Sequence, residues 1–147
     1  MSNNEGVHYV IEGDIARITM NDGKANALSY KMIEGLLAAF DRAEAEAKAV
    51  VLTGRAGRFC AGFDLKVMLQ SMDSAVALLT EGAPLFLRLL RFPKPVIAVS
   101  TGHAIAGGAL LLLAADIAVG VDGPFKIGLN EVSIGLPLPI MAVELAR

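Results

Sequence analysis

Two glycine-rich segments contain the residues whose types and spacing could support chemistry. The first, Gly54–Gly62, and the second, Gly102–Gly108, each follow a β-branched apolar run and precede a helix-forming run. Glycines at a helix start let backbone N–H groups approach a ligand closely, and the helix dipole adds positive potential there. Such a terminus can hold an anion, or the oxygen that becomes negative when a carbonyl is attacked or enolised. The same glycines could equally serve close packing of a helix against a strand.

Three other kinds of chemistry lack their residues in this sequence. Gly57 and Gly62 have the spacing of a P-loop, but Phe63 and Asp64 follow where a P-loop needs Lys and Ser or Thr. Neither segment reads Gly-x-Gly-x-x-Gly, and no Gly-x-Ser-x-Gly elbow is present. The two histidines have no Cys/His cluster around them, so we expect no metal site. What remains is a pair of backbone N–H donors, from two helix starts, that converge on one oxygen.

The segments around these loops predict a single α/β domain. Short β-rich runs predict strands at Val7–Glu12, Ile15–Met20, Ala49–Thr53, Pro95–Val99 and Ile117–Val119. Gly13-Asp14 predicts a hairpin between the first two strands. From Ser100 to Gly107 we expect a tight turn that leads into a buried helix. Because helices then alternate with single strands, at least part of the sheet should be parallel.

Two helices carry further expectations. A helix capped by Ser29 should run to Lys48, with Glu44 and Lys48 paired on its surface four residues apart. Gly82 and Pro84 predict an interruption in the helical segment that precedes the Pro95–Val99 strand.

Composition and charge narrow the class of protein. The 147 residues are 54% hydrophobic with a mean hydropathy of +0.56, which is more apolar material than a monomer of this size readily buries. We therefore expect the chain to oligomerise or to belong to a larger body. A net charge of −2 gives no electrostatic case for a nucleic acid or an anionic membrane as partner.

The sequence also carries indications of location. Cys60 is the single cysteine, which excludes an internal disulfide and fits a reducing compartment. The first six residues have neither the basic region nor the apolar core of a secretory signal. Residues 95–115 carry no Asp, Glu, Lys or Arg, but the Pro and Ser-Thr-Gly-His composition predicts a strand and turn, not a membrane span. We expect a cytoplasmic protein.

Five motifs occur together, in order, over most of the chain: Asn26-Ala27-Leu28, Arg58–Leu65, Pro93–Val99, Gly102–Gly108 and Phe125–Val132. In sequence and spacing they resemble the crotonase superfamily of enoyl-CoA hydratases and isomerases. The resemblance implies a ββα spiral fold, a coenzyme A thioester as substrate, no covalently bound cofactor, and a homo-oligomer, a trimer or hexamer. Residues 1–147 would then form the crotonase-like core domain, the N-terminal part of the spiral. The C-terminal helical trimerisation region of the family would lie outside this chain.

The resemblance also implies roles for individual residues. The oxyanion hole would consist of the backbone N–H groups of Phe63 and Gly107, in agreement with the two glycine-rich helix starts. Glu131 matches the second of the two catalytic glutamates of the hydratases, but Leu110 stands where the first would be. Leucine can neither accept a proton nor orient water, so the resemblance favours an isomerase with Glu131 as its single acid and base. The leucines and Ile134 nearby would supply apolar surroundings for this carboxylate.

Residues in the same motifs should line the path of coenzyme A and its acyl group. The implied contacts are Ala25, Ala61, Phe63, Asp64 and Gly108. Asp64 also has a second interpretation, as a cap for the short helix that follows it. Whether Arg55, Arg58 and Lys66 meet the phosphates of coenzyme A or are simply solvated, the sequence leaves open.

Alternatives remain for the function and for single residues. The chain could be an enoyl-CoA hydratase of fatty-acid β-oxidation, or a non-catalytic subunit that binds coenzyme A or serves assembly. Glu131 could be a structural carboxylate in a turn. His103 is expected to be a packed, hydrogen-bonded residue rather than a base, and Cys60 a small buried hydrophobe rather than a nucleophile.

Overall fold

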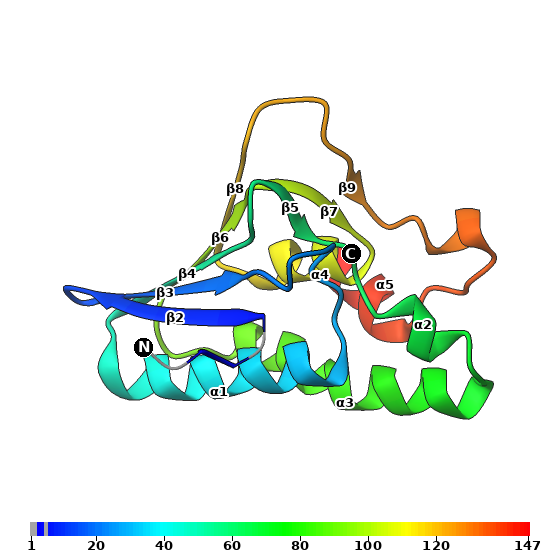
Figure 1. The fold of residues 1–147 in the computed structure, drawn as a ribbon, viewed down its shortest axis with the longest axis horizontal. Helices are drawn as coiled ribbons and strands as arrows, with labels where there is room; N and C mark the ends of the chain where they lie inside the picture. Colours follow the sequence, from blue (N-terminus) through cyan, green and yellow to red (C-terminus); the bar gives the residue numbers. More distant parts are fainter. Residues whose placement is uncertain (1–2, 5) are drawn as a thin grey trace.

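The computed structural model describes residues 3–4 and 6–147, and its backbone forms two sheets with helices between and beside them (Figure 1). The larger sheet has the order β1-β2-β3-β4-β6-β8 and consists of Asn3–Asn4, Val7–Glu12, Ile15–Met20, Ala49–Thr53, Val96–Ser100 and Ile117–Gly120. The smaller sheet has the order β5-β7-β9 and consists of Gly57–Cys60, Gly102–Ile105 and Ile127–Gly128. The helices are α1 Tyr30–Glu46, α2 Leu65–Met68, α3 Met72–Leu90, α4 Gly107–Ala114 and α5 Ile140–Ala146, with a 3-10 turn at Glu131–Ile134.

The larger sheet confirms the predicted hairpin and the predicted parallel core. β2 and β3 pair antiparallel from Val7–Met20 to Glu12–Ile15, while β3, β4, β6 and β8 run parallel. Alternate residues of β3, β4 and β6 are buried, as expected for strands with helices on one face. The α/β fold class predicted from the sequence is therefore confirmed.

Two helices lie side by side against this sheet. α1 and α3 run together beneath it (Figure 1). The ring of Phe40 in α1 packs edge-on against that of Phe92, just beyond the end of α3, with ring centroids 5.3 Å apart. Arg88 of α3 pairs with Asp41 and Glu44 of α1. Ser29 caps α1 as predicted, because its side chain accepts a hydrogen bond from the amide of Met32 at 3.3 Å.

A third helix, α4, lies in the middle of the molecule between the two sheets (Figure 1). Seven of its eight residues are buried, and they cover every side of the helix. A helix that is apolar all round fits only such an interior position. In the described part of the chain no helix is both long and apolar enough to cross a membrane.

Three sequence predictions are wrong. Ser100–Gly107 is not a tight turn, because β7 occupies most of it, and β5 occupies part of the Gly54–Gly62 loop. The helix before β6 is not interrupted: α3 continues through Pro84, and its buried residues Leu78, Leu85, Phe86 and Leu89 pack on both sides of it. Burial of these four large apolar side chains outweighs the cost of about 3 kcal/mol for a proline inside a helix.

The predicted surface pair of α1 is also wrong. Lys48 lies beyond the last residue of the helix, and its ammonium group pairs with Asp14 at 2.6 Å. Glu44 instead pairs with Arg88. Helix α1 ends at Glu46, so the two predicted partners do not share a helical face.

Candidate active site

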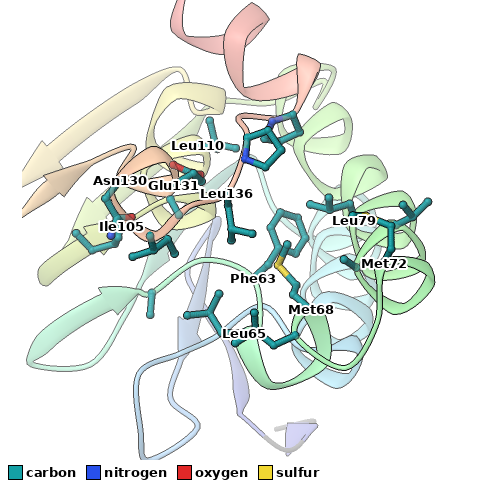
Figure 2. Close-up of a pocket in the computed structure, with 18 of the residues that line it drawn as sticks. Phe63, Leu65, Met68, Met72, Leu79, Ile105, Leu110, Asn130, Glu131 and Leu136 are labelled. Carbon is teal, nitrogen blue, oxygen red and sulfur yellow. The ribbon is translucent and has the colours of Figure 1, made fainter.

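An apolar cavity of about 440 Å³ lies between the smaller sheet and the α2–α3 region (Figure 2). One wall comes from α2 and α3 and includes Leu65, Met68, Met72, Val76 and Leu79. The opposite wall comes from the end of β7, α4 and the turn after β9, and includes Ile105, Leu110, Glu131 and Leu136. In Figure 2 the ring of Phe63 lies between the two walls. The cavity is therefore built from segments that are far apart in the sequence.

Glu131 is the one ionisable side chain among the described residues that line this cavity. It is 8% exposed, and its Oε2 atom has no hydrogen-bond partner among the described residues. Its main chain is fixed as the first residue of the 3-10 turn, where the carbonyl oxygen accepts a hydrogen bond from the amide of Leu136 at 2.9 Å. A buried carboxylate oxygen without a donor is costly unless a ligand or water supplies one. The free Oε2 atom of Glu131 is thus available for a hydrogen bond to a molecule in the cavity.

Leu110 lies beside Glu131 on the same side of the cavity (Figure 2) and is 1% exposed. The buried leucine fills the position at which the resemblance would place the first of the two catalytic glutamates. The carboxylate of Glu131 therefore has an apolar neighbour there, and no second acid or base lines the cavity among the described residues.

The two predicted N–H donors belong to loops in direct contact. A Cβ atom at position 62 would lie 2.9 Å from the amide nitrogen of Gly107, and one at position 107 would lie 3.3 Å from Cα of Gly62. The amide of Phe63 belongs to the peptide that Gly62 begins. Neither the Phe63 amide nor the Gly107 amide donates a hydrogen bond to another residue that the structure describes. Two neighbouring amides without an acceptor are what an oxyanion hole requires.

A strained residue immediately precedes the second donor. Ala106 has φ 53° and ψ −119°, a conformation that favours glycine, and it lines the cavity. Two backbone hydrogen bonds hold it there: its amide donates to the carbonyl of Gly128 at 2.9 Å, and its carbonyl accepts from the amide of Leu110 at 3.1 Å. Strain of this kind is common at functional sites, where the surrounding structure enforces it.

The loop that carries Phe63 is held by residues near the end of β3. The buried side chain of Asn26 donates to the carbonyls of Met20 and Phe59 at 2.9 and 3.0 Å. Leu28 donates to the carbonyl of Gly62 at 2.8 Å, and its own carbonyl accepts from the amide of Asp64 at 3.2 Å. These bonds fix the backbone on both sides of Phe63. Asn26 was missed as a positioning residue, because only its motif, and not its burial, is visible in the sequence.

The predicted substrate contacts separate into two groups. Ala61 and Phe63 line the cavity. Ala25 does not line it; its carbonyl accepts a hydrogen bond from Ala61 at 3.1 Å. Asp64 caps α2 by accepting a hydrogen bond from the amide of Lys66 at 2.9 Å, which confirms its second interpretation. Gly108 is a packing residue, since a Cβ atom there would overlap the carbonyl of Cys60.

The remaining candidates are structural. Cys60 is fully buried, and burial raises the pKa of its thiol to about 12. His103 accepts a hydrogen bond at Nδ1 from the amide of Lys126 at 3.0 Å and packs edge-on against Phe125. Both therefore match the packed, hydrogen-bonded residues that the sequence predicts. Among the described residues no group of three or more His, Cys, Asp or Glu could hold a metal ion.

Residues 10–146 match the model of the enoyl-CoA hydratase/isomerase family. A putative enoyl-CoA hydratase of Thermus thermophilus is 37% identical over 94% of this chain and 57% of its own length. The chain therefore belongs to the enoyl-CoA hydratase/isomerase family, within the crotonase superfamily.

Solved structures agree with this assignment. An enoyl-CoA hydratase/isomerase family protein of Pseudomonas syringae superposes with a TM-score of 0.95 at 44% identity, over 98% of this chain and 63% of that chain. An enoyl-CoA isomerase of Mycobacterium tuberculosis has a TM-score of 0.90 at 42% identity, over 96% of this chain and 62% of that chain. Another structure from the same organism, also at 42% identity, is described as a probable enoyl-CoA hydratase. The chain spans about three fifths of these relatives.

Proposed function

We propose that the cavity binds the acyl part of a coenzyme A thioester and that Glu131 moves a proton on an enoyl group, as in an enoyl-CoA isomerase. The observation that carries this proposal is the buried carboxylate of Glu131, which lies beside Leu110 in an apolar cavity. Its Oε2 atom accepts no hydrogen bond from the residues that the structure describes. Membership of the enoyl-CoA hydratase/isomerase family supports the thioester as substrate. Coenzyme A acts as part of the substrate and is not a bound cofactor.

The proposed reaction needs one carboxylate and one oxyanion hole. Glu131 removes a proton from the α carbon of a β,γ-unsaturated thioester, and the electrons of the C–H bond delocalise into a dienolate. The amides of Phe63 and Gly107 donate hydrogen bonds to the dienolate oxygen, and each such donor is typically worth about 3–4 kcal/mol. The same carboxyl group then returns the proton to the γ carbon. Because the proton taken is the proton returned, no second acid or base is required.

Hydration is the second candidate, and the names of several relatives favour it. Adding water requires a group that orients the water and takes its proton while the α carbon is protonated. In the hydratases of the family two glutamates share this task, and here Leu110 replaces one of them. The proposal therefore predicts faster isomerisation of a 3-enoyl-CoA than hydration of crotonyl-CoA.

The substitution Glu131→Gln tests the assignment. It keeps the shape of the side chain and removes its basicity, so we expect kcat for isomerisation to fall by about 10²–10⁴-fold. Glu144→Gln is the matched control, because Glu144 is an exposed glutamate that pairs with Arg147. Full isomerase activity in the Glu131 variant would show that the assignment is wrong.

A panel of substrates separates the candidates. Isomerisation, hydration and hydrolysis are measured with the same protein preparation on 3-enoyl-, 2-enoyl- and saturated acyl-CoA. Robust hydration of crotonyl-CoA would overturn the inference from Leu110. Tight binding of acyl-CoA without any turnover would instead favour a binding or assembly subunit.

A further inference from the structure

Gly82 lies in the middle of α3, where glycine weakens a helix by about 1 kcal/mol relative to alanine. The structure shows what occupies the space of the missing side chain. A Cβ atom at position 82 would overlap Cε1 of the Phe63 ring and lie 2.8 Å from its Cζ. The ring of Phe63 therefore sits in a notch that only glycine leaves open.

The opposite corner of the same ring faces the other predicted donor loop. A Cβ atom at position 107 would lie 3.4 Å from Cδ2 of Phe63 and 3.0 Å from Cδ1 of Leu28. Because Cδ2 and Cε1 are opposite atoms of a phenyl ring, the ring spans the distance from Gly107 to Gly82. It is 8% exposed, and Phe86 packs against it with ring centroids 6.1 Å apart. Such a packed ring can hardly shift without moving a neighbour.

We infer that Gly82 is a positioning residue for the oxyanion hole, and that the Phe63 ring is a strut between α3 and Gly107. Phe63 thus acts twice: its amide is one donor, and its ring fixes that amide relative to the other donor. This inference rests on the proposed function, because it assumes that the two amides bind the thioester oxygen.

Gly82→Ala is the direct test. The added methyl group would push the ring out of the notch and displace the Phe63 amide, and small misplacements of reacting groups cost up to about 10²-fold in rate. We expect kcat for isomerisation to fall by about 10- to 100-fold, with a much smaller change in KM. Thr80→Ala is the matched control, because Thr80 is exposed, lies two residues earlier on α3 and bonds only within the helix.

A spectroscopic measurement separates positioning from a general loss of structure. Hexanoyl-CoA labelled with ¹³C at the carbonyl has no double bond to move, and an oxyanion hole should lower its C=O stretching frequency on binding. We expect a clear shift with the parent chain and with Thr80→Ala, and a smaller shift with Gly82→Ala at saturating ligand. An unchanged shift and kcat in Gly82→Ala would overturn the inference while leaving the proposed function intact. Binding without any shift in the parent chain would overturn the oxyanion hole itself.

A second variant covers the case in which Gly82→Ala does not fold. Phe63→Leu keeps the amide but shortens the strut, so it should lower both the carbonyl shift and kcat. The double variant Phe63→Leu/Gly82→Ala places a methyl group where the ring was and should recover part of the lost thermal stability. Retention of full carbonyl shift and kcat by Phe63→Leu would overturn the strut.

Discussion

The Cys60 thiol illustrates how a single buried group responds to pH. Its pKa rises from an ordinary 9.0 to about 12, mainly because burial disfavours the thiolate. The unfolded chain therefore loses this proton at lower pH than the folded chain. The contribution of Cys60 to stability is complete below about pH 9 and is lost as the pH rises from 9 toward 12, at about 1.4 kcal/mol per pH unit.

Urea unfolding of the parent chain and of Cys60→Ala across this range measures the effect. The parent should lose stability more steeply than the variant, which isolates the thiol from other groups that titrate there. The folded parent should also resist a thiol reagent at pH 8 until it is unfolded. Rapid modification of the native chain would contradict the buried, inert cysteine.

Ala106 provides a second prediction at the scale of one residue. Its φ of 53° strains an alanine but not a glycine, and such strain costs on the order of 1–3 kcal/mol. Ala106→Gly should therefore raise the free energy of unfolding by about 1 kcal/mol, after the entropy cost of glycine.

Ala104→Gly is the matched control for that substitution. Ala104 is fully buried in β7 and has an ordinary strand conformation, so the same change there should destabilise. Equal destabilisation of the two variants in urea would show that the backbone of Ala106 stores no strain.

At the scale of elements, Asn26 joins the end of β3 to β5. Its buried amide group donates to three backbone carbonyls, including that of Arg58, and its Oδ1 accepts from the amide of Asp22 at 3.0 Å. Asn26→Ala leaves these groups without partners and keeps the positive φ of 54°. We expect a loss of about 3 kcal/mol in unfolding free energy.

Two further measurements define the origin of that loss. Asn26→Gly removes the same hydrogen bonds but tolerates the positive φ, so it should lose less stability than Asn26→Ala. Under the proposed function, both variants should also isomerise 3-enoyl-CoA more slowly, because the loop of Phe63 is no longer fixed. Normal stability of Asn26→Ala would contradict the role of the amide group.

Elements of the larger sheet could be predicted from the sequence because their signals are local. The hairpin at Gly13-Asp14 and the capping of α1 by Ser29 depend on neighbouring residues, and both are confirmed. The path of α3 through Pro84 depends on packing against distant residues, which overrides the local preference of proline. β7 could not be predicted for the same reason, because it forms by pairing with the distant strands β5 and β9.

The candidate site divides in the same way. The resemblance to the crotonase superfamily assigned Glu131, Phe63 and Leu110 to one site, and the structure places all three at one cavity. The sequence predicted Gly82 only as a helix breaker. Its partner, the ring of Phe63, lies nineteen positions earlier in the chain, so the residues around Gly82 do not reveal the contact. Burial of Asn26 is likewise a property of the folded chain alone.

At the scale of the whole molecule, β8 forms one edge of the larger sheet. Within the described residues no strand pairs with its outer side, and its apolar side chains are exposed, Ile117 to 55% and Val119 to 49%. An exposed apolar edge pairs readily with another chain. We expect association of copies in solution, which the composition also predicts.

Sedimentation over a range of concentrations tests this association. The mass should exceed the 15.4 kDa of one chain at high concentration and should fall toward it in Val119→Lys. Ile15→Lys is the control, because Ile15 is also exposed but lies on β3, which pairs with β2 on one side and β4 on the other. A monomer at every concentration would contradict the prediction.

The two walls of the cavity come from different segments of the chain, so the residues of one wall can be substituted independently of the other. Under the proposed function, exchange of Met72, Val76 and Leu79 on α3 should change which acyl chains fit without moving Glu131, which follows β9 on the opposite wall. Gly82 is the exception on α3, because a side chain there would displace the ring of Phe63, which we infer positions the two amides. On that proposal, the cavity-lining residues in the first half of α3 can vary widely while Gly82 must be kept.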